Sequence, residues 1–193
     1  MTQALTLERR DDHIGVLWFD VPKEDVNLLR PELFEQFYAV LDEIESDEQL
    51  KGVVIASGKE DHFSAGADVN LLAEIDSSQE ITALALDGHD LMDRFANLSL
   101  PVVAAIHGTC VGGGLELALA CDARIASEAE ATHLGLTEVK LGLIPGAGGT
   151  QRLPQVIGIE EALNLILTGD TISPKEAVAL GLIDEAVPRW ILL

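Results

Sequence analysis

The feature that most constrains the fold is the alternation of short apolar runs with segments of helical periodicity. Residues 13–20 alternate apolar and polar side chains as a half-buried strand does, while residues 51–57 and 101–106 are continuous apolar runs typical of buried strands. Residues 31–50 instead repeat apolar side chains at helical spacing and begin with a proline, which is favoured at the first helical position. Strands that alternate with helices predict an α/β fold with a largely parallel sheet.

The second half of the chain continues this alternation. We expect a helical region up to Asn97, a helix from Leu115, short strands at 123–127, 131–134 and 183–187, and helices at 150–157, 159–167 and 174–180. Neither an internal repeat nor a low-complexity linker interrupts the 193 residues, of which 48% are hydrophobic, so we expect one domain over residues 1–193. The apolar ending RWILL leads us to expect that the natural protein continues beyond residue 193.

The net charge of the chain narrows the classes of partner that it can bind. The formal net charge is −21, from 33 acidic and 12 basic residues, so we expect no non-specific binding to nucleic acid and no attraction to anionic membranes. The N-terminal residues lack a signal-peptide pattern, and no apolar run reaches the roughly 18 residues of a membrane span. We therefore expect a cytoplasmic protein. Cys110 and Cys121 have no zinc-site spacing and are interpreted as buried, reduced thiols.

Two acidic residues stand in apolar, glycine-rich sequence. Glu116 lies in CVGGGLELALACD (110–122) and Glu138 in LGLTEVKLGLIPGAGGTQRL (134–153). A buried carboxylate without a cation has a raised pKa and destabilises the fold unless hydrogen bonds or water satisfy it. Two such acids around a polar cavity are typical of acid–base catalysis. Glu116 alone also fits a purely structural role, as an acid in a first helical turn.

Two loops of small residues follow predicted buried strands, FSAGAD (63–68) and GTCVGGG (108–114). Small residues let the backbone approach a ligand, and two converging amide N–H groups make an oxyanion hole. A tight strand-to-helix turn without function explains the glycines alone equally well. The run is neither a dinucleotide-binding GxGxxG nor a P-loop, so nucleotide binding is not predicted. His107 and His133 lack triad-like neighbours and are assigned to structural hydrogen bonding.

Three motifs together carry a family resemblance: FSAGADVNLL (63–72), PVVAAIHGTCVGGGLELALACDARIAS (101–127) and LGLTEVKLGLIPGAGGTQRLP (134–154). They resemble the crotonase, or enoyl-CoA hydratase/isomerase, superfamily, and the similarity covers nearly the whole chain. With LILTGDTISPKEAVALGLID (165–184), the resemblance is strongest to the N-terminal hydratase/isomerase region of fatty-acid oxidation complex alpha subunits. It implies a crotonase-like spiral of ββα units from which the C-terminal covering helices are missing.

The resemblance also implies a reaction and its residues. It is the reversible hydration of trans-2-enoyl-CoA to 3-hydroxyacyl-CoA in fatty-acid β-oxidation, with Δ3-Δ2 enoyl-CoA isomerisation as a side activity. The amides of Ala65 and Gly113 would hold the thioester oxygen. Glu116 would deprotonate the added water, and Glu138 would exchange the proton at the α-carbon. The resemblance implies neither a metal nor a separate cofactor, because coenzyme A is part of the substrate.

Contacts to coenzyme A and to partners follow from the same resemblance. The implied CoA-binding residues are Ser64, Ala67, Asp68, Val69, Lys23 and Asn27. Lys23 fits a solvated surface lysine equally well, although an acidic protein needs local cations to offset repulsion of the CoA phosphates. Thr137 stands where the family often has proline, so the loop of Glu138 loses a fixed φ. The expected assembly is a homotrimer or larger, or a complex with a thiolase subunit.

Two other functions stay open at this stage. One is a different acyl-CoA reaction on the same scaffold, such as thioester hydrolysis or decarboxylation, because loop substitutions change the chemistry that a shared fold performs. The other is a non-catalytic acyl-CoA binding module. The presence of both acids favours hydration, because family members with other chemistry usually lack one of them.

Overall fold

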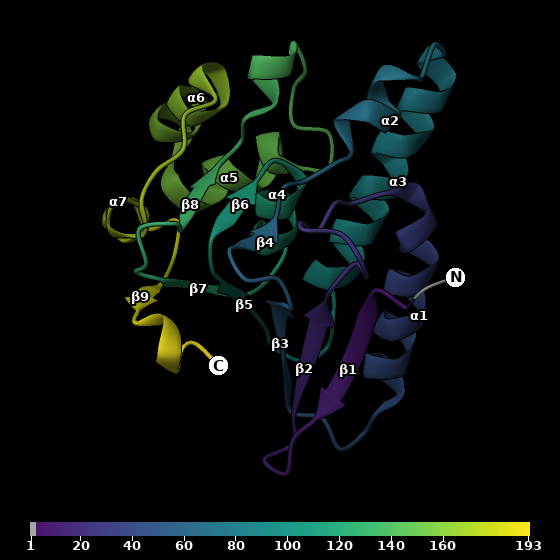
Figure 1. Cartoon of the computed structure of the whole chain (residues 1–193), viewed down its shortest axis with the longest axis vertical. Helices are drawn as coiled ribbons and strands as arrows, with labels where there is room; N and C mark the ends of the chain where they lie inside the picture. The colour runs from purple at the N-terminus through teal and green to yellow at the C-terminus, as the bar shows by residue number, and fades with distance from the viewer. Residues whose placement is uncertain (1–2) are drawn as a thin grey trace.

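The computed structural model describes residues 3–193, and this part of the chain forms two sheets flanked by helices (Figure 1). Its strands are β1 (Leu5–Arg9), β2 (Ile14–Phe19), β3 (Gly52–Ser57), β4 (His62–Ser64), β5 (Val102–Ile106), β6 (Thr109–Val111), β7 (Ala123–Ser127), β8 (His133–Gly135) and β9 (Glu185–Val187). Its helices are α1 (Pro31–Ser46), α2 (Val69–Ala73), α3 (Ser78–Ala96), α4 (Gly113–Leu119), α5 (Gly149–Ile157), α6 (Ile159–Thr168) and α7 (Pro174–Leu180), with 3-10 helices η1 (Glu138–Leu141) and η2 (Arg189–Ile191). None of these helices is long and apolar enough to cross a membrane.

The sheets are almost entirely parallel. The larger sheet has the order β1-β2-β3-β5-β7-β9, in which only the β1–β2 pair is antiparallel. The smaller sheet has the order β4-β6-β8, and both of its pairs are parallel. The prediction of an α/β fold with a largely parallel sheet is therefore confirmed.

The chain winds as a spiral of repeated units. In each of the pairs β3/β4, β5/β6 and β7/β8, the first strand joins the larger sheet and the second joins the smaller one. Helical segments follow each pair before the chain returns to the larger sheet. As a result, the segments after β4, β6 and β8 lie side by side in space, and these segments carry the loops and acids singled out in the sequence.

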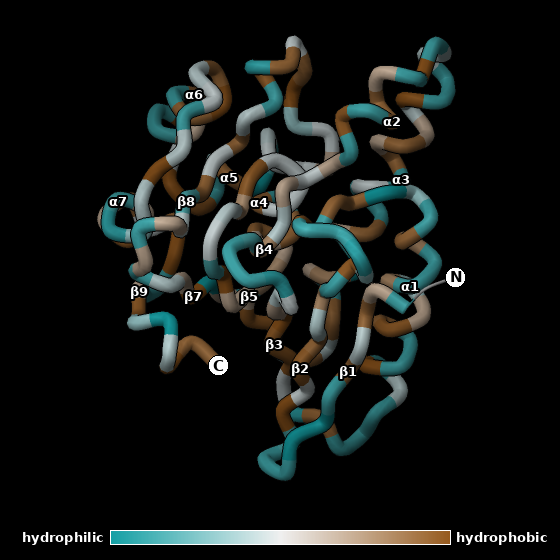
Figure 2. The backbone as a smooth tube through the Cα atoms, in the orientation of Figure 1, coloured by the Kyte–Doolittle hydropathy of each residue, from teal (hydrophilic) through white to brown (hydrophobic). Residues whose placement is uncertain are grey.

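Helices α1 and α3 cover one face of the larger sheet, on the right in Figure 1. Pro31 occupies the start of α1, and the helical spacing of its apolar residues gives one buried face. Phe37 in that face makes edge-to-face contacts with Phe19 and Phe95, at ring-centroid distances of 5.4 and 6.0 Å. In Figure 2 the hydrophobic colour concentrates along β2 and β3, where the core contacts the sheet.

Short strands account for most differences from the sequence expectation. Strand β1 was not predicted, and β4 and β6 lie within segments expected to be loops. Helix α4 begins at Gly113 rather than at Leu115. Three-residue strands carry too few side chains for a period of two to stand out, so only their pairing across the smaller sheet defines them. The expected helical region up to Asn97 is divided into α2 and α3.

Lys59 organises the turn that follows β2. Its ammonium nitrogen lies 2.6 Å from a carboxylate oxygen of Asp20 and donates to the carbonyl oxygens of Val21 at 2.5 Å and Glu24 at 2.7 Å. Its side chain is only 9% exposed, so the turn wraps around a nearly buried cation. Within this turn, Lys23 is exposed and has a φ of 65°, a left-handed conformation that is uncommon for a residue with a side chain.

Candidate active site

Glu116 lies on α4 and is almost fully buried, with 2% of its surface exposed. Its Oε1 atom accepts hydrogen bonds from the amides of Ala147 and Gly149, each at 2.8 Å. Gly149 is the first residue of α5, where backbone N–H groups lack acceptors within the helix and favour an anion. Burial raises the pKa of Glu116, while these two amides act in the opposite direction. One oxygen is therefore held by the backbone.

Glu138 begins η1, and fewer hydrogen bonds offset the burial of its carboxyl group than at Glu116. Its Oε2 atom is buried and has no hydrogen-bond partner among residues 3–193. Burial, and to a lesser degree the negative charge of Glu116, raise the pKa of Glu138 to about 7. Near neutral pH this carboxyl group can therefore both donate and accept a proton.

Gly112 shows how close the second acid lies to α4. A Cβ atom added at Gly112 would lie 3.3 Å from Oε1 of Glu138, and Gly112 immediately precedes the helix that carries Glu116. The structure thus brings Glu116 and Glu138 to the N-terminal end of α4. Thr137 precedes η1 with a φ of −95°, and its side chain makes no capping hydrogen bond.

The two loops of small residues touch each other beside these acids. A Cβ atom added at Gly66 would lie 2.8 Å from the amide nitrogen of Gly113 and 3.0 Å from the carbonyl oxygen of Val111. A Cβ atom added at Gly113 would lie 3.7 Å from the amide nitrogen of Ala67. Because both positions are glycine, the backbones approach without intervening side chains.

The amide of Ala65 is not available for a ligand. It donates a hydrogen bond of 3.0 Å to the carbonyl oxygen of Asn27, which argues against the predicted role of Ala65 in an oxyanion hole. In the described part of the chain, the amides of Ala67 and Gly113 have no such acceptor. Of these two alanines, Ala67 rather than Ala65 therefore has the amide that is free to donate to a ligand. Sequence reasoning missed this because all three small residues of the loop fit equally well.

The side chains of two residues predicted to bind CoA make hydrogen bonds within the fold. Asn27 is fully buried, and its side chain bonds to the backbone of Val21, Phe19 and Phe63 and to the hydroxyl of Ser57. Ser64 is also fully buried and donates to the carbonyl oxygen of Asn27 at 3.0 Å. Both side chains are thus occupied within the protein, and contact of these residues with CoA through their backbone stays a prediction. A polar residue at 0% exposure is recognisable only from the packed fold.

The remaining predicted CoA residues lie on the surface beside the loop. Ala67 and Val69 are exposed, and the isolated bridge between Leu29 and Ala67 aligns the segment after the Lys23 turn with this loop. Asp68 caps α2 by accepting from the amide of Asn70 at 3.0 Å. Its other oxygen pairs with Arg30 at 2.8 Å, and this hydrogen bond holds the pKa of Asp68 below its ordinary value.

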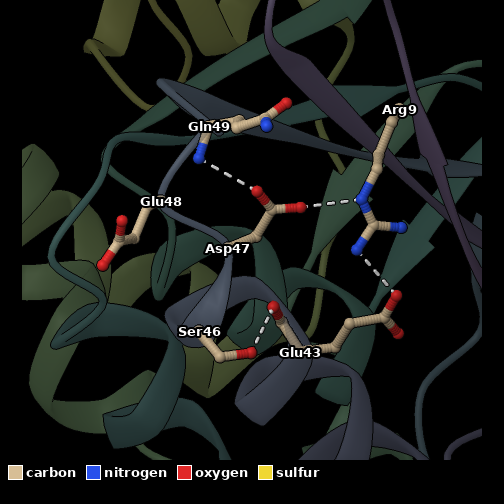
Figure 3. A pocket seen from close by; sticks show the side chains of 6 residues that line it. All are labelled: Arg9, Glu43, Ser46, Asp47, Glu48 and Gln49. Carbon is tan, nitrogen blue, oxygen red and sulfur yellow. Dashed lines mark hydrogen bonds and ion pairs between the residues drawn. The ribbon is translucent and has the colours of Figure 1, made fainter.

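Two hollows on the described surface have no predicted site residue in their lining. A hollow of about 440 Å³ lies between the end of α1 and β1 (Figure 3). Its residues are Arg9, Glu43, Ser46, Asp47, Glu48 and Gln49. Arg9 bridges Glu43 and Asp47 there, which is a surface ion-pair cluster. Within residues 3–193, no group of three or more His, Cys, Asp or Glu side chains is arranged to hold a metal ion.

The spiral of ββα units, with two acids beside touching amide-rich loops, defines a crotonase-type architecture. A family model described as enoyl-CoA hydratase/isomerase matches residues 9–193, and the chain belongs to this family. The chain is 49% identical over all 193 residues to the fatty acid oxidation complex subunit alpha of Shewanella amazonensis (strain ATCC BAA-1098 / SB2B). It spans only 27% of the length of that relative, in its N-terminal region.

Solved structures support the same conclusion. The chain is 37% identical to the enoyl-CoA hydratase from Bacillus anthracis, with a TM-score of 0.91 over 98% of this chain and 72% of that one. A structure from Geobacillus kaustophilus HTA426 is also 37% identical, with a TM-score of 0.92 over 98% and 70% of the two chains. The predicted crotonase-like fold is thereby confirmed.

Proposed function

We propose that the chain catalyses the reversible hydration of trans-2-enoyl-CoA to 3-hydroxyacyl-CoA in fatty-acid oxidation. The single observation that supports this most is that the two acids lie in different environments. Glu116 has one oxygen fixed by two amides, whereas Glu138 has a buried oxygen without a partner and a pKa of about 7. Two adjacent acids in different environments suit a reaction that needs one base and one acid.

In the proposed reaction, ionised Glu116 takes a proton from water as the water oxygen bonds to the β-carbon. The electrons of the carbon–carbon double bond move toward the thioester, whose oxygen becomes negatively charged. Protonated Glu138 then delivers its proton to the α-carbon, and the carbonyl group is restored. Proton exchange with water returns Glu116 to its ionised form and Glu138 to its protonated form. No metal or separate cofactor takes part, because coenzyme A belongs to the substrate.

The negative thioester oxygen needs donors that are in place before the reaction. We assign this role to the amides of Ala67 and Gly113, which lack protein acceptors within residues 3–193 and lie on touching loops. Loss of one such donor typically costs about 3 to 4 kcal/mol of transition-state stabilisation. Gly113 also stands at the N-terminus of α4, whose partial positive charge favours an oxyanion.

The test measures hydration of crotonyl-CoA by the variants Glu116→Gln and Glu138→Gln. Hydration is monitored as the loss of absorbance of the conjugated thioester. Because each variant removes one proton-transfer group, we expect kcat to fall by about 10² to 10⁴. Glu161→Gln, at an exposed position of α6, is the control and should retain full activity. Undiminished turnover in both active-site variants would exclude this function and leave thioester hydrolysis, decarboxylation or acyl-CoA binding alone to be examined.

Isomerisation of 3-enoyl-CoA is a second candidate, favoured by the pKa of about 7 at Glu138. A single carboxylate near its pKa can remove a proton from the α-carbon and return it to the γ-carbon. In the same assay series, Glu116→Gln should then keep isomerisation while losing hydration, and Glu138→Gln should lose both.

We also propose that the chain works within an assembly in the cytoplasm. The support for an assembly is the name of its relative, a subunit of a fatty acid oxidation complex. The family resemblance implies a thiolase partner or a homotrimer as the two candidate assemblies. Light scattering on the purified chain, alone and with a thiolase subunit, distinguishes these assemblies.

A further inference from the structure

The position of Glu116 depends on one short loop, residues 146–149. The two amides that hold Oε1 come from Ala147 and Gly149, so any shift of this loop moves the carboxylate. Helix α3 packs on the loop from the other side, since a Cβ atom at Gly88 would lie 3.2 Å from Cβ of Ala147. The loop is therefore the link between Glu116 and the surrounding helices.

Arg152 contacts the same loop. Its Nη1 atom donates to the carbonyl oxygen of Ala147 at 3.1 Å, on the same residue whose amide holds Glu116. Its Nη2 atom lies 2.5 Å from a carboxylate oxygen of Asp93 on α3. The side chain of Arg152 is only 16% exposed, so the guanidinium is largely shielded from water.

Gly148 shows that the guanidinium packs directly against the loop backbone. A Cβ atom at Gly148 would lie 2.0 Å from Nη1 of Arg152, and the residue has a φ of 108°. Only glycine leaves space for this contact and adopts this conformation readily. A continuous set of contacts thus runs from Asp93 through Arg152 and the loop to Glu116.

We propose that Arg152 and Asp93 are a positioning pair that fixes the loop at residues 146–149 and thereby the orientation of Glu116. Neither side chain touches the reacting atoms, so they act through the loop. This proposal rests on the proposed function for its consequence in catalysis. The charged and titratable groups that act on Glu116 are His89 on α3, Arg152 on α5 and Glu138 on η1.

The experiment compares Arg152→Met, Arg152→Lys and Asp93→Asn with a matched control, Arg94→Met. Arg94 lies on α3, as Asp93 does, and pairs with carboxylates as Arg152 does. Its partners Asp42 and Glu45, however, lie on α1. Lysine keeps the positive charge and loses the planar fork that contacts both Ala147 and Asp93. The variants therefore separate the loss of charge from the loss of geometry. Melting temperature and circular dichroism identify the variants that fold.

For Arg152→Met we expect kcat for crotonyl-CoA to fall about 100-fold with KM within about threefold, because a misplacement of about 1 Å has effects of that size. The acidic limb of kcat/KM should move to higher pH, because the charge of Arg152 favours the ionised form of Glu116 and lowers its pKa. Arg152→Lys should keep the limb in place and recover part of kcat. Asp93→Asn should lie between Arg152→Lys and Arg152→Met in kcat, and Arg94→Met should match the wild type.

In folded Arg152→Met, a lowered kcat with the pH limb in place indicates a merely structural role and overturns the proposal. So does Arg152→Met with wild-type kcat. If Arg152→Met does not fold, wild-type kcat in both Arg152→Lys and Asp93→Asn overturns the proposal. A wild-type chain without hydratase activity would refute the proposed function instead. The positioning role is then read from the ¹³C titration of the Glu116 carboxyl, assigned with Glu116→Gln, whose midpoint must rise in Arg152→Met.

Discussion

Single residues decide what the two touching loops can do. Ala65 and Ala67 have the same side chain and lie two positions apart, yet only the amide of Ala67 is left without a protein acceptor in the described chain. The difference arises because Asn27, fixed by several buried hydrogen bonds, presents its carbonyl oxygen to Ala65. A buried asparagine remote in sequence thus determines which of the two amides stays free of a protein acceptor.

Gly66→Ala tests the close approach of the loops. Its Cβ atom would lie 2.8 Å from the amide nitrogen of Gly113, so the loops must separate and the amides must lose their alignment. We expect kcat for hydration to fall roughly 10- to 100-fold. Gly181→Ala is the control, because Gly181 also has a positive φ, of 76°, but has no atom within 4 Å of the added Cβ. Both variants lose about 1 to 2 kcal/mol of stability from the backbone conformation, and equal kcat values in the two would contradict the prediction.

Glu138 should make stability depend on pH. Its pKa rises from an ordinary value of 4.5 to about 7 in the folded chain, so folding favours its protonated form. This contribution to stability is fully present below pH 4.5 and is lost as the pH rises through about 7. The free energy of unfolding of the wild type, minus that of Glu138→Gln, should therefore fall by up to ~3 kcal/mol between pH 4.5 and pH 8. Urea unfolding of both proteins at the two pH values measures it, and a constant difference refutes it.

At the scale of elements, the turn after β2 is held by Lys59, a residue outside the turn. Two carbonyl groups and one carboxylate surround its ammonium group, which uses all three donors. This turn and the segment up to Leu29 run beside the loop at residues 63–68. Lys59 therefore links strand β3 to the region that we expect to meet coenzyme A.

Lys59→Met should unfold more easily because Val21 and Glu24 would lose a charged donor to their carbonyl groups. Hydrogen bonds to charged groups contribute about 1.5 to 3 kcal/mol each, so we expect the loss of two to lower the free energy of unfolding by about 3 to 6 kcal/mol. Lys175→Met, at an exposed position in α7, should change it by less than about 0.5 kcal/mol. Urea titration of both variants gives the comparison, and similar values for the two would show that the turn does not depend on Lys59.

The sequence predicted the long elements well and the short ones poorly. Helix α1 and strands β2, β3 and β5 carry enough apolar residues for their period to be read directly. The strands of the smaller sheet have three residues each, and their identity depends on partners from distant parts of the chain. Local pattern contains no information on such pairing.

The same distinction applies to the candidate site. Glu116 and Glu138 were recognisable because carboxylates are unexpected in apolar sequence. The amides of Ala147 and Gly149 were missed, although the sequence GAGG indicated a backbone free to approach a ligand. The contact of Arg152 with the loop at residues 146–149 was also missed. An arginine in a helix is ordinarily a surface residue, and only the folded structure shows that this one packs on the loop.

For the molecule as a whole, the net charge of −21 opposes the binding of an anionic substrate. The phosphate groups of coenzyme A would be repelled at long range, whereas Lys23 is an exposed positive charge in the turn that precedes the segment paired with the loop at residues 63–68. Long-range repulsion is screened more strongly by salt than a close contact is. The Debye length shortens from about 30 Å at 0.01 M to about 10 Å at 0.1 M salt.

Salt should therefore improve the binding of CoA thioesters. We expect the KM of crotonyl-CoA to fall about threefold or more between 0.01 and 0.2 M sodium chloride, because screening removes repulsion by the whole protein. The KM of crotonyl-pantetheine, which lacks the phosphates of the nucleotide, should stay nearly constant and is the control. Lys23→Ala should raise KM for the CoA thioester alone and steepen its dependence on salt. If KM instead rises with salt, local cations outweigh the net charge, and the acidic surface does not govern substrate capture.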